Sequence, residues 1–185
     1  MNVQKSFKTK IMKKTTSLLI VLMALVCQAS FAQNAATADS VTINFITNAT
    51  VANMKEIATG KLAEKKAKDP SVKSYGAKMI EHHTMATKQM AELVKTKKIE
   101  VPKPPVAMAK PDSMLANSSG AEFDRTYITM MIADHKKTIA LFETASTKLT
   151  DADLKAFAVK TLPMLKQHLA EVQGIASKMN ITATE

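Results

Sequence analysis

The chain of 185 residues has little cysteine, glycine or aromatic content: one cysteine, four glycines, two tyrosines and no tryptophan. The single cysteine, Cys27, lies in an N-terminal segment that we expect to be removed, so the mature chain has no disulfide, thiol nucleophile or thiolate metal site. Few glycines leave little room for strained catalytic loops. No Gly-x-Ser-x-Gly elbow, phosphate-binding loop or His-Glu-x-x-His motif occurs. These absences weigh against an enzyme.

Residues 1–32 have the pattern of a signal peptide. Five lysines and no acidic residue come first, and an apolar run from Leu18 to Val26 follows that is too short to span a bilayer. Small residues at Ser30 and Ala32 then permit cleavage before Gln33. Met12 is an alternative start, and a lipid anchor at Cys27 is an alternative to cleavage. The segment predicts export, most simply to the periplasm. Association with the cell envelope is the alternative location.

The net charge of +10 overstates the basic character of the mature chain. Without the five lysines of the signal peptide, 21 basic residues face 16 acidic ones, a net charge of +5. The lysines alternate with acidic residues along helical stretches such as 61–66, which is typical of a solvated helix face. With two tyrosines and no tryptophan there is little for bases to stack on. We therefore expect no nucleic-acid partner and no membrane span after signal removal; a protein partner is unknown.

Apolar and small residues recur at helical spacing in four stretches, about 40–68, 70–97, 121–148 and 150–178. Asp69-Pro70 is a helix-entry signal, Thr150 is the expected cap of the last helix, and Pro163 predicts a kink or fresh start within it. Four prolines between residues 98 and 120 indicate an extended crossover with a short turn after Asp112. The chain thus divides into a flexible lead-in at 33–39, an all-α four-helix bundle at 40–178, and a tail at 179–185.

Three of these stretches place a histidine on the inner helical stripe, and the first places an acidic residue there. The candidate ligands are Glu56, His83, His135 and His168. Imidazole and carboxylate groups suit a transition metal such as Cu, Zn or Fe, and bundle cores commonly hold metals. A methionine precedes each histidine by four residues, which places both side chains on one face. Their thioethers are candidate soft ligands that would favour Cu(I): Met79, Met131 and Met164.

Two other interpretations of the same residues stand beside this one. A di-iron carboxylate centre requires Glu-x-x-His, but Ile80, Ile132 and Leu165 stand three residues before the histidines, so that centre is excluded. The histidines can instead form a metal-free network, bonded to one another, to acidic neighbours or to backbone carbonyls, that fixes helix register. In that case the methionines are flexible core filler. The sequence leaves the metal site and the network open.

Several phrases resemble a known family: Met79-Ile80-Glu81-His82-His83-Thr84, Gly120-Ala121-Glu122-Phe123-Asp124-Arg125-Thr126-Tyr127, Ala133-Asp134-His135, and Leu162-Pro163 followed by His168. Over residues 40–178 the chain is similar to domain of unknown function 4142, an exported bacterial family grouped with ferritin-like four-helix bundles. The family has no established activity, so the resemblance implies a fold and a location. The positions that match its pattern are Glu56, His83, Phe123, Asp124, Tyr127, His135, Pro163 and His168. The family usually has an acidic residue where this chain has His82.

The sequence therefore predicts an exported, ferritin-like helix-bundle protein whose core His/Glu cluster binds a transition metal. The alternative is a metal-free structural or interaction module of the cell envelope, related to stress. In that case the Pro-rich connection at 101–106 is the candidate segment for a partner, unless it is a plain linker.

Overall fold

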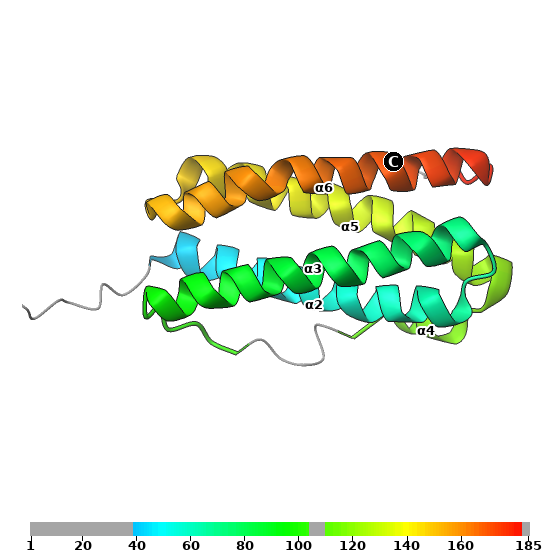
Figure 1. Ribbon diagram of the computed structural model, residues 1–185, viewed down its shortest axis with the longest axis horizontal. Helices are drawn as coiled ribbons and strands as arrows, with labels where there is room; N and C mark the ends of the chain where they lie inside the picture. The colour runs from blue at the N-terminus through cyan, green and yellow to red at the C-terminus, as the bar shows by residue number, and fades with distance from the viewer. Residues whose placement is uncertain (1–38, 104–109, 183–185) are drawn as a thin grey trace, which may run out of the picture. The chain divides into compact units, whose positions relative to one another are not determined.

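The computed structural model describes residues 39–103 and 110–182, which form a bundle of four long helices (Figure 1). The long helices are α2 (Ser40–Lys66), α3 (Pro70–Thr96), α5 (Gly120–Lys148) and α6 (Ala152–Lys178), and α4 (Ser113–Asn117) is a single short turn. Apart from an isolated bridge between Ala67 and Gly120, these residues contain no strand. The predicted all-α bundle is confirmed. The predicted signal peptide, nearly all of the lead-in, and residues 104–109 of the crossover lie outside the described residues.

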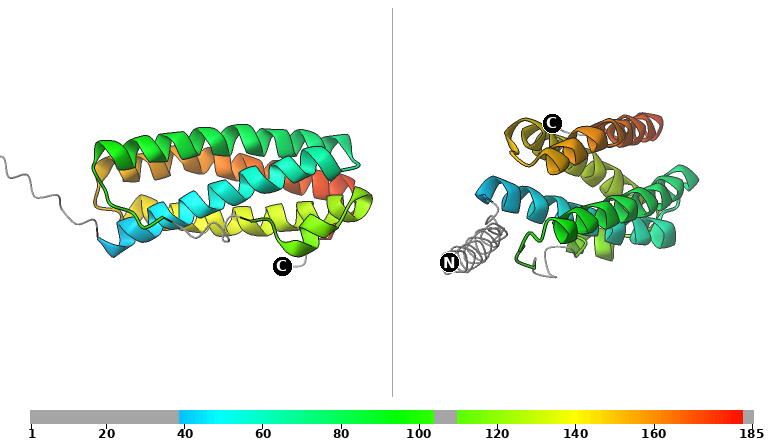
Figure 2. Two further views of the ribbon diagram at one scale, coloured as in Figure 1. Left: turned by 90° about the horizontal axis from the view of Figure 1, so that it is seen from below. Right: turned by 60° about the vertical axis from the view of Figure 1, so that its left-hand side comes forward.

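The helices pack as two antiparallel hairpins, α2 with α3 and α5 with α6 (Figures 1 and 2). Further packing of α2 on α5 and of α3 on α6 closes the ring, so α3 lies diagonal to α5. Helices α3 and α5 run in the same direction (Figure 1), so the chain between them must connect opposite ends of the bundle. The long predicted crossover is thus present. No helix within the described ranges is long and apolar enough to cross a membrane.

Aspartate side chains accept hydrogen bonds from backbone amides at four of the helix starts. The N-caps are Asp39, Asp69, Asp112 and Asp151. The predicted entry at Asp69-Pro70 is confirmed, whereas the predicted cap at Thr150 is wrong. The Asp151 carboxylate accepts from the Asp153 and Leu154 amides at 3.1 and 3.0 Å, so it bonds two of the free amides that every helix start presents.

Helix α6 continues through Pro163 as one element, so the fresh start that the proline suggested does not occur. Pro163 has no N–H to bond the carbonyl of Val159. Val159 is exposed, so solvent can replace the missing donor. Packing of the apolar face then outweighs the loss of one internal bond.

Helices α2 and α3 approach each other closely where Gly60 faces Gly76. A Cβ atom on Gly60 would lie 2.7 Å from the Gly76 carbonyl oxygen, and a Cβ on Gly76 would lie 2.7 Å from the Ala63 Cβ. Both distances are far below van der Waals contact, so this crossing requires glycine at both positions. The glycine pair therefore fixes how α2 and α3 are aligned along their lengths.

The apolar core is divided into two clusters, one at each end of the bundle. The first contains Ala63, Ala67, Val72, Tyr75, Met79, Leu115, Phe123, Tyr127, Ile128, Met131, Ile132, Val172, Ile175, Ala176 and Ile181. The second contains Phe45, Ile46, Ala49, Met90, Ile139, Phe142, Ala145, Leu149, Leu154, Phe157, Ala158 and Leu165. Ile181 comes from the predicted tail and is nevertheless buried against the first cluster. Between the clusters lies a layer of buried polar side chains.

Candidate metal centre

All four long helices contribute to this polar layer. Its members are Asn53 and Glu56 on α2, His83 on α3, His135 on α5 and His168 on α6, and each is at most 6 % exposed. In α3, α5 and α6 the histidine lies between a residue of the first apolar cluster and a residue of the second. Helical periodicity therefore points the histidines inward, as the sequence predicted, and the packing of the helices brings them to one level.

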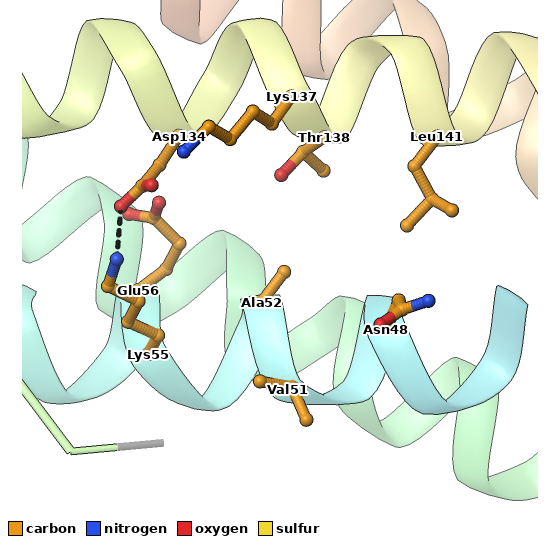
Figure 3. Close-up of a pocket in the computed structure, with 9 residues that line it drawn as sticks. All are labelled: Asn48, Val51, Ala52, Lys55, Glu56, Asp134, Lys137, Thr138 and Leu141. Atoms are coloured by element: carbon orange, nitrogen blue, oxygen red, sulfur yellow. Dashed lines mark hydrogen bonds and ion pairs between the residues drawn. The ribbon is translucent and has the colours of Figure 1, made fainter. Parts of the chain in front are cut away.

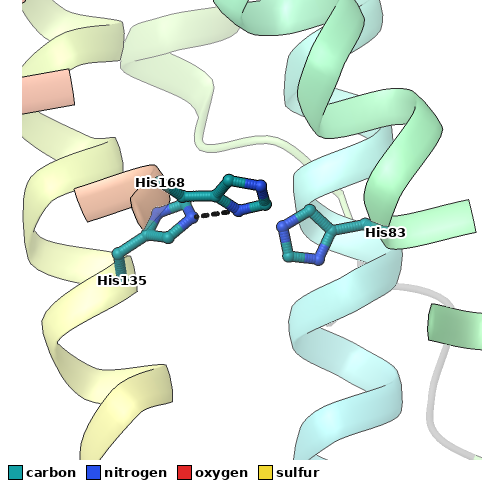
Figure 4. A group of neighbouring side chains, drawn as sticks. All are labelled: His83, His135 and His168. Atoms are coloured by element: carbon teal, nitrogen blue, oxygen red, sulfur yellow. Dashed lines mark hydrogen bonds between the residues drawn. The ribbon is translucent and has the colours of Figure 1, made fainter. Parts of the chain in front are cut away.

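The three histidine rings converge on one point in the core (Figure 4). One ring nitrogen from each of His83, His135 and His168 lies within 4.8 Å of the other two. The ring centroids are 5.4 to 6.0 Å apart. A common ion can bind only residues this close together, so the geometry meets the first requirement of a shared site.

The nitrogens that face outward from His83 and His135 are hydrogen-bonded. His83 Nδ1 lies 2.8 Å from the Asn53 side-chain oxygen, and His135 Nδ1 lies 2.9 Å from the Met131 carbonyl oxygen. Both oxygens only accept, so each Nδ1 carries the proton and each Nε2 keeps its lone pair. This arrangement is typical of metal-binding histidines, whose second nitrogen is held by an outer partner.

His168 is held by a fourth histidine at the edge of the layer. Its Nε2 lies 2.8 Å from Nδ1 of the half-buried His82, and the two rings stack with centroids 5.0 Å apart. On the other side, His168 Nδ1 lies 3.4 Å from His135 Nε2. Without an ion, His168 Nδ1 donates to His135 and Nε2 accepts from His82. An ion on Nδ1 would require the opposite tautomer, with Nε2 donating to His82.

Burial lowers the pKa of all three inner histidines. For His83 the pKa falls well below its usual value, and for His168 it falls to about 3, first because burial disfavours the charged ring and then because the neighbouring histidines do. Burial also lowers the pKa of His135, against the opposing effect of its bond to Met131. The rings are therefore neutral at physiological pH, which is the form that binds metals.

Glu56 is buried beside His135 but lies outside the group of three nitrogens. Its Oε1 is 4.0 Å from His135 Nδ1, the nitrogen that donates to Met131. Burial, and then the charge of Asp134, raises its pKa to about 8. Glu56 Oε2 has no hydrogen-bond partner within the described residues. The sequence predicted that Glu56 would be a ligand; the structure instead places it on the outer side of the His135 ring.

The three methionines pack in different surroundings. Met79 and Met131 are fully buried in the first apolar cluster, and Met164 is half-buried. The part of Met131 that bonds His135 is its backbone carbonyl, not its sulfur. Core packing accounts for Met79 and Met131, and a thioether ligand stays a prediction.

Two contributors to the layer were missed in the sequence. Asn53, which bonds His83, lies one turn before Glu56 on the same face of α2, so its helical spacing was a usable signal. His82 was noted only as a departure from the family pattern, with no role. Its bond to His168 depends on how α3 packs on α6, which no local pattern shows.

The fold and the polar layer together define an all-α bundle with a histidine cluster buried at its centre. The sequence pattern of Domain of unknown function (DUF4142) matches residues 27–175. The chain therefore belongs to this family. No functionally curated protein matches it. The ferritin-like relation that the resemblance implied stays a prediction.

Several solved structures share the fold. A candidate secreted protein, DUF305, from Streptomyces coelicolor superposes with a TM-score of 0.66 at 11 % identity, over 76 % of this chain and 93 % of that one. A conserved hypothetical protein from Mycobacterium tuberculosis gives 0.60 at 12 % identity, over 79 % and 97 %. At such low identity, the likeness shows the fold alone.

Proposed function

We propose that this protein is an exported metal-binding bundle that holds one transition-metal ion between His83, His135 and His168. The convergence of three neutral imidazoles, with nitrogens within 4.8 Å of one another, carries the proposal. His83 Nε2 adds to it, because it is buried and has no hydrogen-bond partner among the described residues. An ion would use the lone pair of that nitrogen.

The three imidazoles lie close enough together that only small side-chain movements are needed to bind a first-row transition-metal ion. In a tetrahedral site with bonds of about 2.0–2.1 Å, ligand nitrogens lie about 3.4 Å apart. Small rotations of the three rings would close the present span of 4.8 Å. Imidazole nitrogen suits Zn, Cu and Fe, and three protein ligands leave a fourth position for water or a further group. Glu56 and the methionines would then tune the surroundings.

The proposal of export rests on the pattern of residues 1–32. The structural neighbour from Streptomyces coelicolor is described as a candidate secreted protein, which agrees with this location. A periplasmic protein meets metals directly from the medium, so storage or transfer of an ion is the simplest role for a buried site without a catalytic nucleophile.

The test is the metal content of the mature chain, purified without a histidine tag from cells grown with Cu, Zn and Fe. Elemental mass spectrometry would measure bound metal per chain in the wild type and in a variant carrying His83→Ala, His135→Ala and His168→Ala. Thr59→Ala is the matched control, because Thr59 is equally buried near the layer but its hydroxyl bonds only carbonyls of its own helix. We expect one ion per chain in the wild type and control, and none in the triple variant.

The alternative is the metal-free structural or interaction module. The bonds from His82 to His168 and from His168 to His135 favour it, because they join three rings without an ion. An absence of metal from the wild type, together with a triple variant that is merely less stable, would establish this alternative. Metal retained by a folded triple variant would also contradict the proposed site.

A further inference from the structure

A pocket of about 300 Å³ opens between α2 and α5 (Figure 3), and Glu56 of the polar layer is among the residues that line it. Its walls are mostly apolar and include Val51 and Ala52 from α2 and Leu141 from α5. Figure 3 shows Ala52 and Leu141 pointing into the space between the two helices. This volume is at the lower end of small-molecule sites, which are mostly apolar with a few placed polar groups.

One buried polar atom at this pocket has no partner. Glu56 lines the pocket and is 4 % exposed, and its Oε2 bonds no other group in the described part of the chain. A buried polar atom left without a hydrogen bond has a free-energy cost, because it has lost its bonds to water. A molecule in the pocket that reached Oε2 would remove this cost. The pocket therefore has a polar anchor point as well as apolar walls.

The full charges at the pocket are paired or exposed. Lys55 and Asp134 pair with each other at 2.7 Å, and Lys137 lies exposed on α5. The Glu56 carboxyl is left as the polar group for a ligand. A hydroxyl can donate to this carboxyl in its ionised form and accept from it in its protonated form, so a neutral hydroxyl head group fits both forms.

We propose that the pocket between α2 and α5 binds a small neutral molecule with an apolar body and a hydroxyl head group, which bonds Glu56 Oε2. The apolar body lies against Val51, Ala52 and Leu141. This site is separate from the proposed metal site and does not depend on a bound ion, because its lining residues include none of the three histidines.

The test compares four probes of one shape: hexan-1-ol, 1-fluorohexane, hexanoate and hexylammonium. Each is titrated into the metal-free mature chain, and binding is followed by NMR of the methyl groups of Val51, Thr138 and Leu141. We expect hexan-1-ol to bind with a Kd of about 1 mM or below and to shift these methyls selectively. 1-Fluorohexane cannot donate a hydrogen bond, and we expect it to bind about tenfold more weakly.

Two variants locate the site. Ala52→Leu fills the pocket and is expected to abolish the shifts. Ala140→Leu makes the same change on the exposed face of α5 and is expected to leave them unchanged. Glu56→Leu removes the anchor, so hexan-1-ol and 1-fluorohexane should then bind equally.

Each contrary result overturns a definite part of the proposal. Binding that survives Ala52→Leu, or the absence of methyl shifts with all four probes, would exclude the pocket as the site. Equal binding of hexan-1-ol and 1-fluorohexane to the wild type would exclude the bond to Glu56. Tighter binding of hexanoate or hexylammonium would exclude a neutral ligand. None of these outcomes bears on the metal content measured above.

Discussion

Two carboxylates are buried in this bundle, and their surroundings differ sharply. Asp124, near the start of α5, accepts hydrogen bonds from the backbone amides of Lys68 and Asp69 at 3.0 and 2.9 Å. Glu56, in the polar layer, has one oxygen with no hydrogen-bond partner among the described residues. Asp124 is 2 % exposed and Glu56 is 4 % exposed, so burial alone does not distinguish them. The difference lies in what each one bonds.

The bonds of Asp124 have a purely structural purpose. They attach the turn between α2 and α3 to the start of α5, beside the bridge between Ala67 and Gly120. The polar layer instead leaves unpartnered atoms on Asn53, Glu56 and His83. Each such atom costs free energy of folding, and unsatisfied polar groups in a core tend to mark functional sites. The comparison supports the proposal that the layer holds a ligand, whereas the turn serves the fold.

Removal of the Asp124 side chain should have the largest effect on stability. In Asp124→Ala the amides of Lys68 and Asp69 lose their acceptor, and we expect the free energy of unfolding to fall by about 3 kcal/mol. Urea unfolding followed by circular dichroism measures it. Asp112→Ala removes an exposed cap that also accepts a backbone amide, and should cost only about 1 kcal/mol. If Asp124→Ala and Asp112→Ala lost equal free energy of unfolding, the buried Asp124 would be no more important to the fold than an exposed helix cap.

The helices and their inner faces were predictable because apolar periodicity and caps are local signals. The inward direction of His83, His135 and His168 followed from the same periodicity. The divided core did not, because it depends on which levels of different helices meet. Pro163 shows the limit most clearly: its local rule predicts an interruption, and tertiary packing keeps α6 whole.

The site was predicted in part for the same reason. Spacing identified the three histidines, but the bonds that orient them come from other helices or from the backbone. Asn53 reaches His83 across α2 and α3, and His82 reaches His168 across α3 and α6. Glu56 lies on the face of α2 that the periodicity predicted. Which side of the His135 ring it occupies depends on the distance between α2 and α5. Contacts of this kind are set by helix packing, which one sequence does not reveal.

The raised pKa of Glu56 should make its effect on stability depend on pH. Between the usual value of 4.5 and the folded value of about 8, the folded state binds the Glu56 proton more tightly than the unfolded state does. Its contribution to stability therefore falls as pH rises through this window. Glu56→Gln removes the effect, so the variant should gain about 2 kcal/mol relative to wild type between about pH 5.5 and pH 7.

The lowered pKa values of the histidines act in the opposite direction, since they make stability rise with pH up to about the usual value of 6.5. The histidines are present in both the wild type and Glu56→Gln, so their contribution cancels in the difference between the two free energies of unfolding. Chemical denaturation at several pH values gives the comparison, with Glu92→Gln on the exposed face of α3 as the control. A difference between Glu56→Gln and wild type that does not vary with pH would show that Glu56 is ionised in the folded protein.

Replacement of His82 should have the smallest effect, and it tests how the layer is oriented. When an ion is on His168 Nδ1, the proton on His168 Nε2 must be donated to His82 Nδ1. In His82→Ala this acceptor is lost, and we expect the affinity for the ion to fall about tenfold, equivalent to about 1.4 kcal/mol. His82→Asn should restore most of the affinity, because its side-chain oxygen can take the place of Nδ1.

Competition with a chromophoric chelator measures the affinity, and nitrogen-15 NMR of the imidazoles identifies the tautomer of His168. We expect the His168 proton to move from Nδ1 to Nε2 when the ion binds, and its bond to His82 to persist. An unchanged affinity in His82→Ala would mean that solvent holds His168 as well as His82 does. His82 would then only shield the layer from solvent. The contrast with Asp124 would rest on the unpartnered buried atoms of Asn53, Glu56 and His83 alone.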